Sequence, residues 1–110
     1  MQITITRSGG FVWWPQKLGP VDTEALPQET ANKVGELIAK INFFNLPPDI
    51  AGPAGPSVFD YSTTVTDGAR RHTVHFNDNS PEDYLSQMNE LIQLLVSSGA
   101  EFGPPEPPKA

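Results

Sequence analysis

The sequence predicts an α+β fold in which a four-stranded antiparallel sheet carries two main helices on one face. Runs with alternating polarity predict the strands, and two of these runs flank an Asp-Gly turn. Two longer segments repeat apolar residues at three- and four-residue spacing, which is typical of amphipathic helices. The order is β-β-α-β-β-α, and two hairpins with two one-sided helices favour a sheet covered on a single face.

The first predicted hairpin occupies residues 2–21. The run QITITR alternates polar and apolar residues and places its two isoleucines on one face, as in a half-buried strand. The glycine pair that follows interrupts this strand, and residues 11–21 are expected to pair back against it. Pro15 and Pro20 cannot donate to a strand ladder, so the second strand is expected at an edge of the sheet or in two pieces.

The first helix is predicted between proline signals. Asp22 or Thr23 is suited to cap a short first turn, and Pro27 fits the first helical position. The two prolines of FFNLPP cannot continue a helix, so the helix ends before them, and the apolar residues of FFNL are expected to tuck under the sheet. The apolar face of this helix consists of Ala31, Val34, Leu37, Ile38 and Ile41.

The second hairpin is the clearest signal in the chain. In VFDYSTTVTDGARRHTVHFND, two β-prone runs flank Asp67-Gly68, a strong hairpin turn. On the polar face, Asp60 is a candidate to pair with Arg70 or Arg71 across the hairpin. Alternation places Phe59, Tyr61, Thr63 and Val65 on one face of the first run, and His72, Val74 and Phe76 on one face of the second.

The second helix is predicted in the segment NSPEDYLSQMNELIQLLVSS. Ser80 is expected to cap it, Pro81 to start it and Gly99 to end it. Its apolar stripe consists of Leu85, Met88, Leu91, Ile92 and Leu95, with Tyr84 beside it. We therefore predict a single α+β domain over residues 1–99, followed by a flexible Pro-rich tail over residues 100–110.

Composition restricts the function classes. The 110-residue chain fits one domain, and its formal net charge of −6 argues against nucleic-acid binding, which needs clustered Lys and Arg. There is no cysteine, so disulfides and thiolate metal sites are excluded. No run approaches the length of a membrane span and no targeting segment is recognisable, so we expect a cytoplasmic monomer that contacts no membrane.

No catalytic constellation emerges from the residue types. His72 and His75 are three apart on a predicted strand, so they point to opposite faces and cannot chelate one metal ion. The glycines after the first strand lead into an aromatic, strand-like segment, whereas a phosphate-binding loop leads into a helix. We expect no catalytic residue, no metal and no cofactor, and an enzyme is the least favoured class.

The segment GGFVWW is the candidate partner-binding site. Strand alternation would place Phe11 and Trp13 on one face, and Val12 and Trp14 on the other. Only one side of the predicted sheet is buried, so at least one large aromatic residue is expected to be exposed or to cover an edge. Exposed Trp is enriched at protein–protein hot spots. For Trp14, a partner contact and flat packing on the outer face both stay open, and Phe11 is expected in the core. The candidate residues are Gly9, Gly10, Phe11, Val12, Trp13 and Trp14.

Several short motifs together resemble one family. SGGF, VDT with the following leucine, FFNLP, DYSTTVTDG and RRHTV occur in the order and spacing of the emfourin-like proteins, small bacterial inhibitors of thermolysin-like zinc metalloproteases of the protealysin group. The resemblance covers roughly residues 3–95. It implies an α/β sandwich with a four-stranded sheet, no cofactor, and binding to the active-site cleft of the protease. The matching positions are Gly9, Gly10, Phe11, Asp60, Tyr61, Asp67, Gly68, His72 and Thr73.

Two functions follow from these observations. In the first, the protein blocks the cleft of a thermolysin-like metalloprotease non-covalently. The aromatic turn makes the main contact, and the N-terminus or residues 47–56 make additional contacts. Trp13 and Trp14 stand where the family resemblance predicts small residues, which implies a different protease preference or a loss of inhibition. In the second, the protein is a small interaction module for an unrelated partner, with residues 11–14 as hot spot and the Pro-rich tail as ligand for an aromatic groove.

Overall fold

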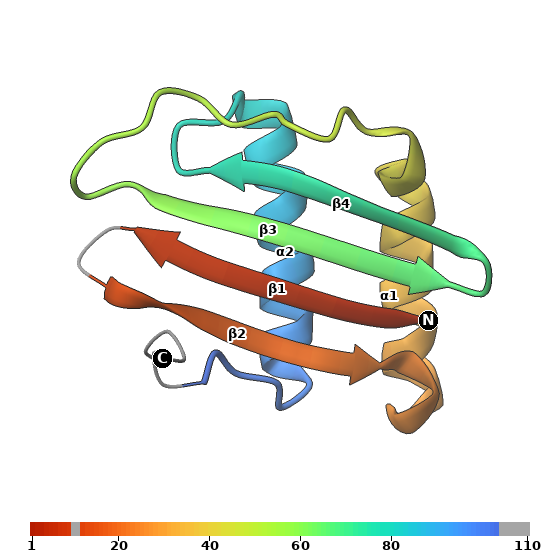
Figure 1. Cartoon of the computed structure of the whole chain (residues 1–110). Coiled ribbons are helices and arrows are strands. Elements are labelled where there is room, and N and C mark those ends of the chain that lie inside the picture. Colours follow the sequence, from red (N-terminus) through yellow and green to blue (C-terminus); the bar gives the residue numbers. More distant parts are fainter. Residues whose placement is uncertain (10–11, 104–110) are drawn as a thin grey trace.

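The computed structural model describes residues 1–9 and 12–103, without the side chains of residues 12–14. The strands and helices follow one another in the predicted order (Figure 1). They are β1 (Gln2–Gly9), β2 (Val12–Asp22), the 3-10 turn η1 (Thr23–Ala25), α1 (Gln28–Lys40), the 3-10 turn η2 (Phe43–Asn45), β3 (Phe59–Asp67), β4 (Arg70–Asn77) and α2 (Glu82–Ser97).

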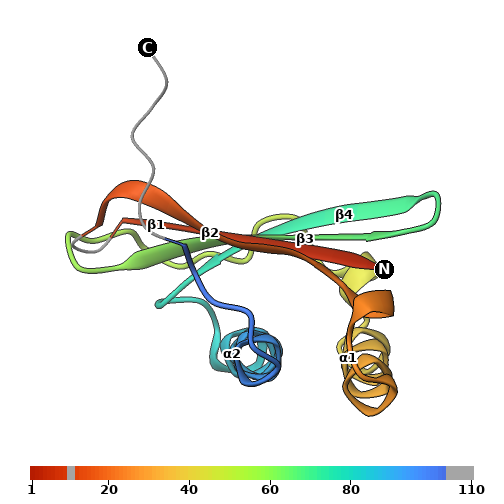
Figure 2. The ribbon, with the colours of Figure 1, turned by 90° about the horizontal axis from the view of Figure 1, so that it is seen from below.

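The four strands form one sheet in the order β2-β1-β3-β4, and every neighbouring pair is antiparallel. Figure 2 shows α1 and α2 side by side on the same face of this sheet, and no helix of the described residues covers the opposite face. The predicted α+β fold is therefore confirmed. β2 is an edge strand, as its prolines predict, and its pairing with β1 shifts register between Ile3 and Ile5 and again between Arg7 and Gly9.

The core lies between the sheet and the two helices. Apolar side chains from the helix-facing side of the strands meet the stripes that the sequence predicts on both helices, and their removal from water is the main favourable term in folding. Neither helix of the described residues is both long and apolar enough to cross a membrane. The fully buried members of this core include Ile3, Ile5, Leu18, Val34, Phe43, Val65, Val74, Phe76, Leu91 and Leu95.

The ends of the helices differ in detail from the prediction. Asp22 caps η1, where its Oδ1 accepts a hydrogen bond from the N–H of Glu24 at 3.0 Å, as expected. Pro27 and Pro81 each stand one position before their helix instead of at its first residue. The predicted cap at Ser80 is wrong, because its hydroxyl accepts the N–H of Asn77 at 2.9 Å and makes no bond to the helix.

The C-terminus of α2 is closed by a Schellman motif, which agrees with the predicted stop at Gly99. Gly99 has φ +106° and donates its N–H to the carbonyl of Val96, and the N–H of Ala100 donates to the carbonyl of Leu95. This turn directs the following residues back towards the sheet. Phe102 then forms an antiparallel bridge with Leu18 on β2.

A second extra segment lies along the opposite edge of the sheet. The N–H of His75 on β4 donates to the carbonyl of Pro48, and the N–H of Ile50 donates to the carbonyl of His75, both at 2.8 Å. Asp49 is thereby paired in parallel with His75. Both edge strands, β2 and β4, thus have part of their outer side covered by short segments of the same chain.

Candidate partner-binding site

The predicted site lies at one end of the sheet, where β1 turns into β2. Gly9 is the last residue of β1 and pairs with Val12, the first residue of β2. Gly10 and Phe11 lie outside the described residues, so the expectation that Phe11 belongs to the core stays a prediction. Trp13 and Trp14 are placed by their backbone in β2, at the edge of the sheet. The six candidate residues therefore run from the end of β1 through the connection to the first three residues of β2, which is an edge strand.

Gly9 is required by the backbone of this turn. Its φ is +81°, a conformation that side chains disfavour, and it pairs with Phe59 of β3 on its other side. A Cβ added to Gly9 would stand 2.7 Å from the carbonyl oxygen of Val58. The start of β3 therefore packs directly against the turn, and no larger residue fits without a shift of the backbone.

Arg7 supports the turn from the helix-facing side of the sheet. Its Nε and Nη2 donate to Oε1 of Gln16 at 3.0 and 2.6 Å, which connects paired positions on β1 and β2. Its guanidinium group also lies 4.1 Å from the ring centre of Phe102 and 5.2 Å from that of Phe59. Cation–π contact and hydrogen bonding together hold a planar cation in one orientation. Arg7 therefore ties three strands and the C-terminal segment together two residues before Gly9.

Aromatic rings continue this cluster along β3 and β4. Tyr61 stacks on the buried ring of Phe76 with a centroid distance of 4.8 Å, and lies 6.4 Å from Phe59 and Phe102. Burial, and secondly the nearby Asp78 carboxylate, raise the pKa of Tyr61 above its ordinary value of 10.0, against the opposing effect of Arg7. Tyr61 is thus a neutral, packed residue beneath the site.

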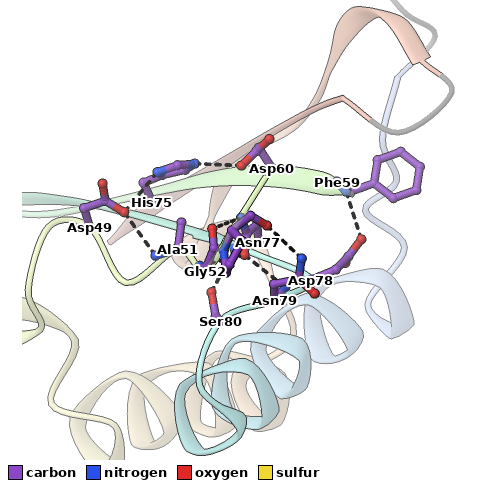
Figure 3. Close-up of polar contacts among 11 residues, drawn as sticks. Asp49, Ala51, Gly52, Phe59, Asp60, His75, Asn77, Asp78, Asn79 and Ser80 are labelled. Carbon is purple, nitrogen blue, oxygen red and sulfur yellow. Dashed lines mark hydrogen bonds and ion pairs between the residues drawn. The ribbon is translucent and has the colours of Figure 1, made fainter. Parts of the chain in front are cut away.

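A Gly/Pro loop, residues 51–58, reaches the same end of the sheet and is held by the side chain of Asn77 (Figure 3). Oδ1 of Asn77 accepts the N–H of Gly52 at 2.9 Å and that of Asn79 at 3.0 Å, and Nδ2 donates to the carbonyl of Gly52 at 2.8 Å. Nδ2 of Asn79 donates to the carbonyl of Pro53 at 2.7 Å. Asn77 is only 1% exposed. The loop is therefore fixed by hydrogen bonds from the buried side chain of Asn77 and from Asn79 before it reaches Val58, next to Gly9.

The polar face of the hairpin pairs differently from the prediction. Asp60 contacts Nε2 of His75 at 3.0 Å, and Asp49 contacts Nδ1 of the same ring at 3.2 Å (Figure 3). The predicted pairing of Asp60 with Arg70 or Arg71 is wrong, and Arg70 instead binds Asp67 across the turn at 2.9 Å. Only the imidazolium carries two N–H donors, so full bonding to both carboxylates requires the protonated ring.

The two histidines lie on opposite faces of β4, as predicted. His72 faces the helices, where its Nε2 is 2.7 Å from the carbonyl oxygen of Leu46 and its ring packs edge-on against Phe43. Over residues 1–9 and 12–103, no group of three His, Cys, Asp or Glu side chains is arranged to hold a metal ion. A groove of about 350 Å³ lies by the β3–β4 turn and the C-terminal end of α1, lined among others by Met1, Phe44 and Arg70.

These features define a class of protein: a small α+β protein with a one-sided four-stranded sheet, in which Arg7 and the start of β3 hold the end of β1 at Gly9. More specifically, the chain belongs to the Emfourin family, whose family model matches residues 5–95. This confirms the resemblance found in the sequence, and membership implies the role of a metalloprotease inhibitor. Neither the comparison with curated proteins nor that with solved structures found a match.

Sequence reasoning located the turn but missed the residues that support it. Arg7 reads as an ordinary polar residue of an alternating strand, and Asn77 as the end of one. Each has a partner far along the chain: the guanidinium group of Arg7 lies over the ring of Phe102, and Asn77 bonds Gly52 across 25 positions. The one signal that could have pointed to Asn77 is the Asn-Asp-Asn-Ser run that begins with it at the end of β4, because such side chains favour bonds to nearby backbone.

Proposed function

We propose that this protein inhibits a thermolysin-like zinc metalloprotease by occupying its active-site cleft without covalent chemistry. The contact surface is the β1–β2 turn with the first part of β2, and it comprises Gly9, Gly10, Phe11, Val12, Trp13 and Trp14. Family membership supports the class of partner. A cleft of this kind favours a bulky apolar side chain just past the scissile bond, and the aromatic turn offers several.

The observation that carries the choice of surface is the support around Gly9. Arg7 holds the two strands of the turn together, and the carbonyl of Val58 packs against Gly9 from the neighbouring strand. A loop that is ordered before binding loses little conformational entropy when it binds, so more of its contact energy remains as affinity. Residues 51–58 lie beside this turn and form the second element of the proposed surface.

The test is a titration of a thermolysin-like protease with the purified protein, with residual peptidase activity as the readout. We expect stoichiometric loss of activity with one inhibitor per protease, and the inhibitor should remain uncleaved on a denaturing gel. Full protease activity at large excess would contradict inhibition of that protease. It would favour the alternative of an unrelated protein partner, for which residues 11–14 remain the proposed hot spot.

The surface is tested by a Trp13→Ser, Trp14→Ser double variant. Hot-spot aromatic residues contribute about 2 kcal/mol or more, so the inhibition constant should rise roughly 30-fold or more. The matched control is Val96→Ser, which removes an exposed apolar side chain from α2, where Val96 is 42% exposed. Unchanged inhibition by the double variant would remove the two tryptophans from the proposed surface.

A further inference from the structure

The four residues that follow the turn after α2, residues 100–103, lie against the outer edge of β2. We call them the C-terminal strap. Phe102 bridges Leu18 in antiparallel register, and the N–H of Gly103 donates to the carbonyl of Lys17 at 2.9 Å. The side-chain amide of Gln16 donates in turn to the carbonyl of Gly103 at 3.3 Å. The strap lies beyond residues 5–95, which the family model matches.

The strap also completes the packing around Arg7. The ring of Phe102 lies 4.1 Å from the guanidinium carbon of Arg7, closer than the ring of Phe59 at 5.2 Å. Gln16 accepts from Arg7 and donates to Gly103, so a continuous line of polar contacts runs from β1 through β2 to the strap. Phe102 is half-buried and packs against the core, and its ring centre lies 6.4 Å from that of Tyr61.

The hairpin of β1 and β2 needs such support more than the other hairpin does. Its ladder shifts register twice, whereas the pairs of β3 with β4 run without a shift from Asp60 to Asp67. Pro15 and Pro20 contribute no N–H to it. An edge strand with an interrupted ladder opens more readily than a central one, and contacts on its outer side limit this opening.

We propose that the C-terminal strap is a positioning element for the partner-binding turn. Phe102 holds Arg7 in place, Gly103 holds β2, and the ends of β1 and β2 that flank the turn thereby keep the arrangement that the protease cleft accepts. This inference rests on the proposed function for its consequence, which is tight inhibition. Its structural part, the restraint of β1 and β2 by residues 100–103, does not depend on the protease.

The first experiment compares three chains: the full protein, a chain ending at Gly103, and a chain ending at Gly99. Both truncations remove the Pro-rich end, but only the second also removes the strap. We expect amide exchange in residues 12–18 to become about tenfold faster or more in the chain ending at Gly99, with β3 and β4 unchanged. The inhibition constant should rise about tenfold in parallel. The chain ending at Gly103 should match the full protein in both measurements.

Point variants separate positioning from simple core filling. Phe102→Leu keeps an apolar side chain but removes the ring over Arg7, whereas Phe102→Tyr keeps the ring. We expect faster exchange in residues 12–18 and weaker inhibition for Phe102→Leu, and values of the full protein for Phe102→Tyr. Equal behaviour of both variants and the unmodified protein would overturn the proposal. If the chain ending at Gly99 does not fold, these two variants still test whether the strap positions the hairpin.

The two proposals fail in distinguishable ways. Suppose that none of the three chains inhibits the protease but amide exchange in residues 12–18 is faster without the strap. The proposed function then fails, and the restraint of the hairpin by the strap stands. When the full protein inhibits and the chain ending at Gly99 inhibits equally well with unchanged exchange, the function stands and the strap has no positioning role. Equal inhibition with faster exchange would also overturn the proposal, because a loosened turn would then bind as well as a held one.

Discussion

Asn77 bonds both backbone groups of Gly52, although 25 residues separate them: Oδ1 accepts the glycine N–H at 2.9 Å and Nδ2 donates to its carbonyl at 2.8 Å. A carboxamide in this arrangement imitates the backbone of a neighbouring strand. It satisfies a loop that has no partner strand of its own. The start of the loop is thereby fixed on β4, and its end reaches the turn at Gly9.

Asn77→Asp is expected to destabilise the protein. The carboxylate has nearly the same shape but cannot donate to the carbonyl of Gly52, and it places a charge where Asn77 is 1% exposed. The free energy of unfolding at pH 7 should fall by about 2 kcal/mol or more in denaturant titrations. Asn89→Asp, an exposed position of α2, is the matched control and should change it by less than about 0.5 kcal/mol. Equal unfolding free energies for both variants would show that the hydrogen bonds between Asn77 and Gly52 do not stabilise the protein.

Gly9→Ala should cost more stability than Gly68→Ala. Both glycines have positive φ, so both substitutions carry the penalty of this conformation, about 1–2 kcal/mol. Only at Gly9 would the new Cβ meet backbone, since it would stand 2.7 Å from the carbonyl oxygen of Val58, whereas nothing lies within 4 Å at Gly68. Comparison of the two unfolding free energies isolates the steric part, and equal losses would show that β3 yields to the added methyl group.

Arg7→Lys should weaken the hairpin although the charge is kept. An ammonium group cannot make the paired contacts of Nε and Nη2 with Gln16 while lying flat on Phe102. We expect a loss of about 1–2 kcal/mol in the free energy of unfolding. Arg71→Lys on the exposed face of β4 serves as the control. A loss no greater than that of the control would show that charge alone suffices at residue 7.

Stability should fall as the pH rises above 10, and Tyr61 should be one cause. The pKa of Tyr61 is raised in the folded state by burial and by Asp78, whereas in the unfolded chain it is close to its ordinary value of 10.0. Above pH 10 the unfolded chain therefore binds fewer protons than the folded one, so the free energy of unfolding decreases with pH until the folded-state pKa is passed. The contribution is fully present below pH 10.

The measurement is the unfolding midpoint of the protein and of Tyr61→Phe between pH 8 and 11. The variant has no phenol at this position, so its midpoint should decline less steeply above pH 10. Parallel curves would show that Tyr61 ionises equally easily in the folded and unfolded states.

The strands and helices could be predicted because their signals are local. Alternation along β3 and β4, the Asp67-Gly68 turn and the apolar stripes of α1 and α2 each lie within one short segment. The order of these segments then favoured one layer of helices on one layer of sheet. Prolines at residues 15 and 20 restricted the second strand to an edge or to two pieces, and the structure has β2 at an edge.

What could not be predicted depends on contacts between distant segments. Phe102 reads as part of a Pro-rich end, and only the folded chain brings it to Leu18 and Arg7. Asp60 has two arginines nearby along the hairpin, yet a histidine from β4 and a loop aspartate form the observed group. Ser80 precedes a helix, as caps do, but the tight turn after β4 brings its hydroxyl to the N–H of Asn77. Alternative polar partners of similar energy are not distinguished by spacing alone.

The short segments along β2 and β4 have a consequence for how much of this protein a cell can hold. An open strand edge invites a second sheet to join it, and such joining leads to aggregates. Here Phe102 covers part of one edge and Asp49 part of the other, so two copies cannot readily extend each other's sheets. An inhibitor that binds one target per molecule, as proposed above, must accumulate to the amount of its target. Covered edges permit that accumulation without precipitation.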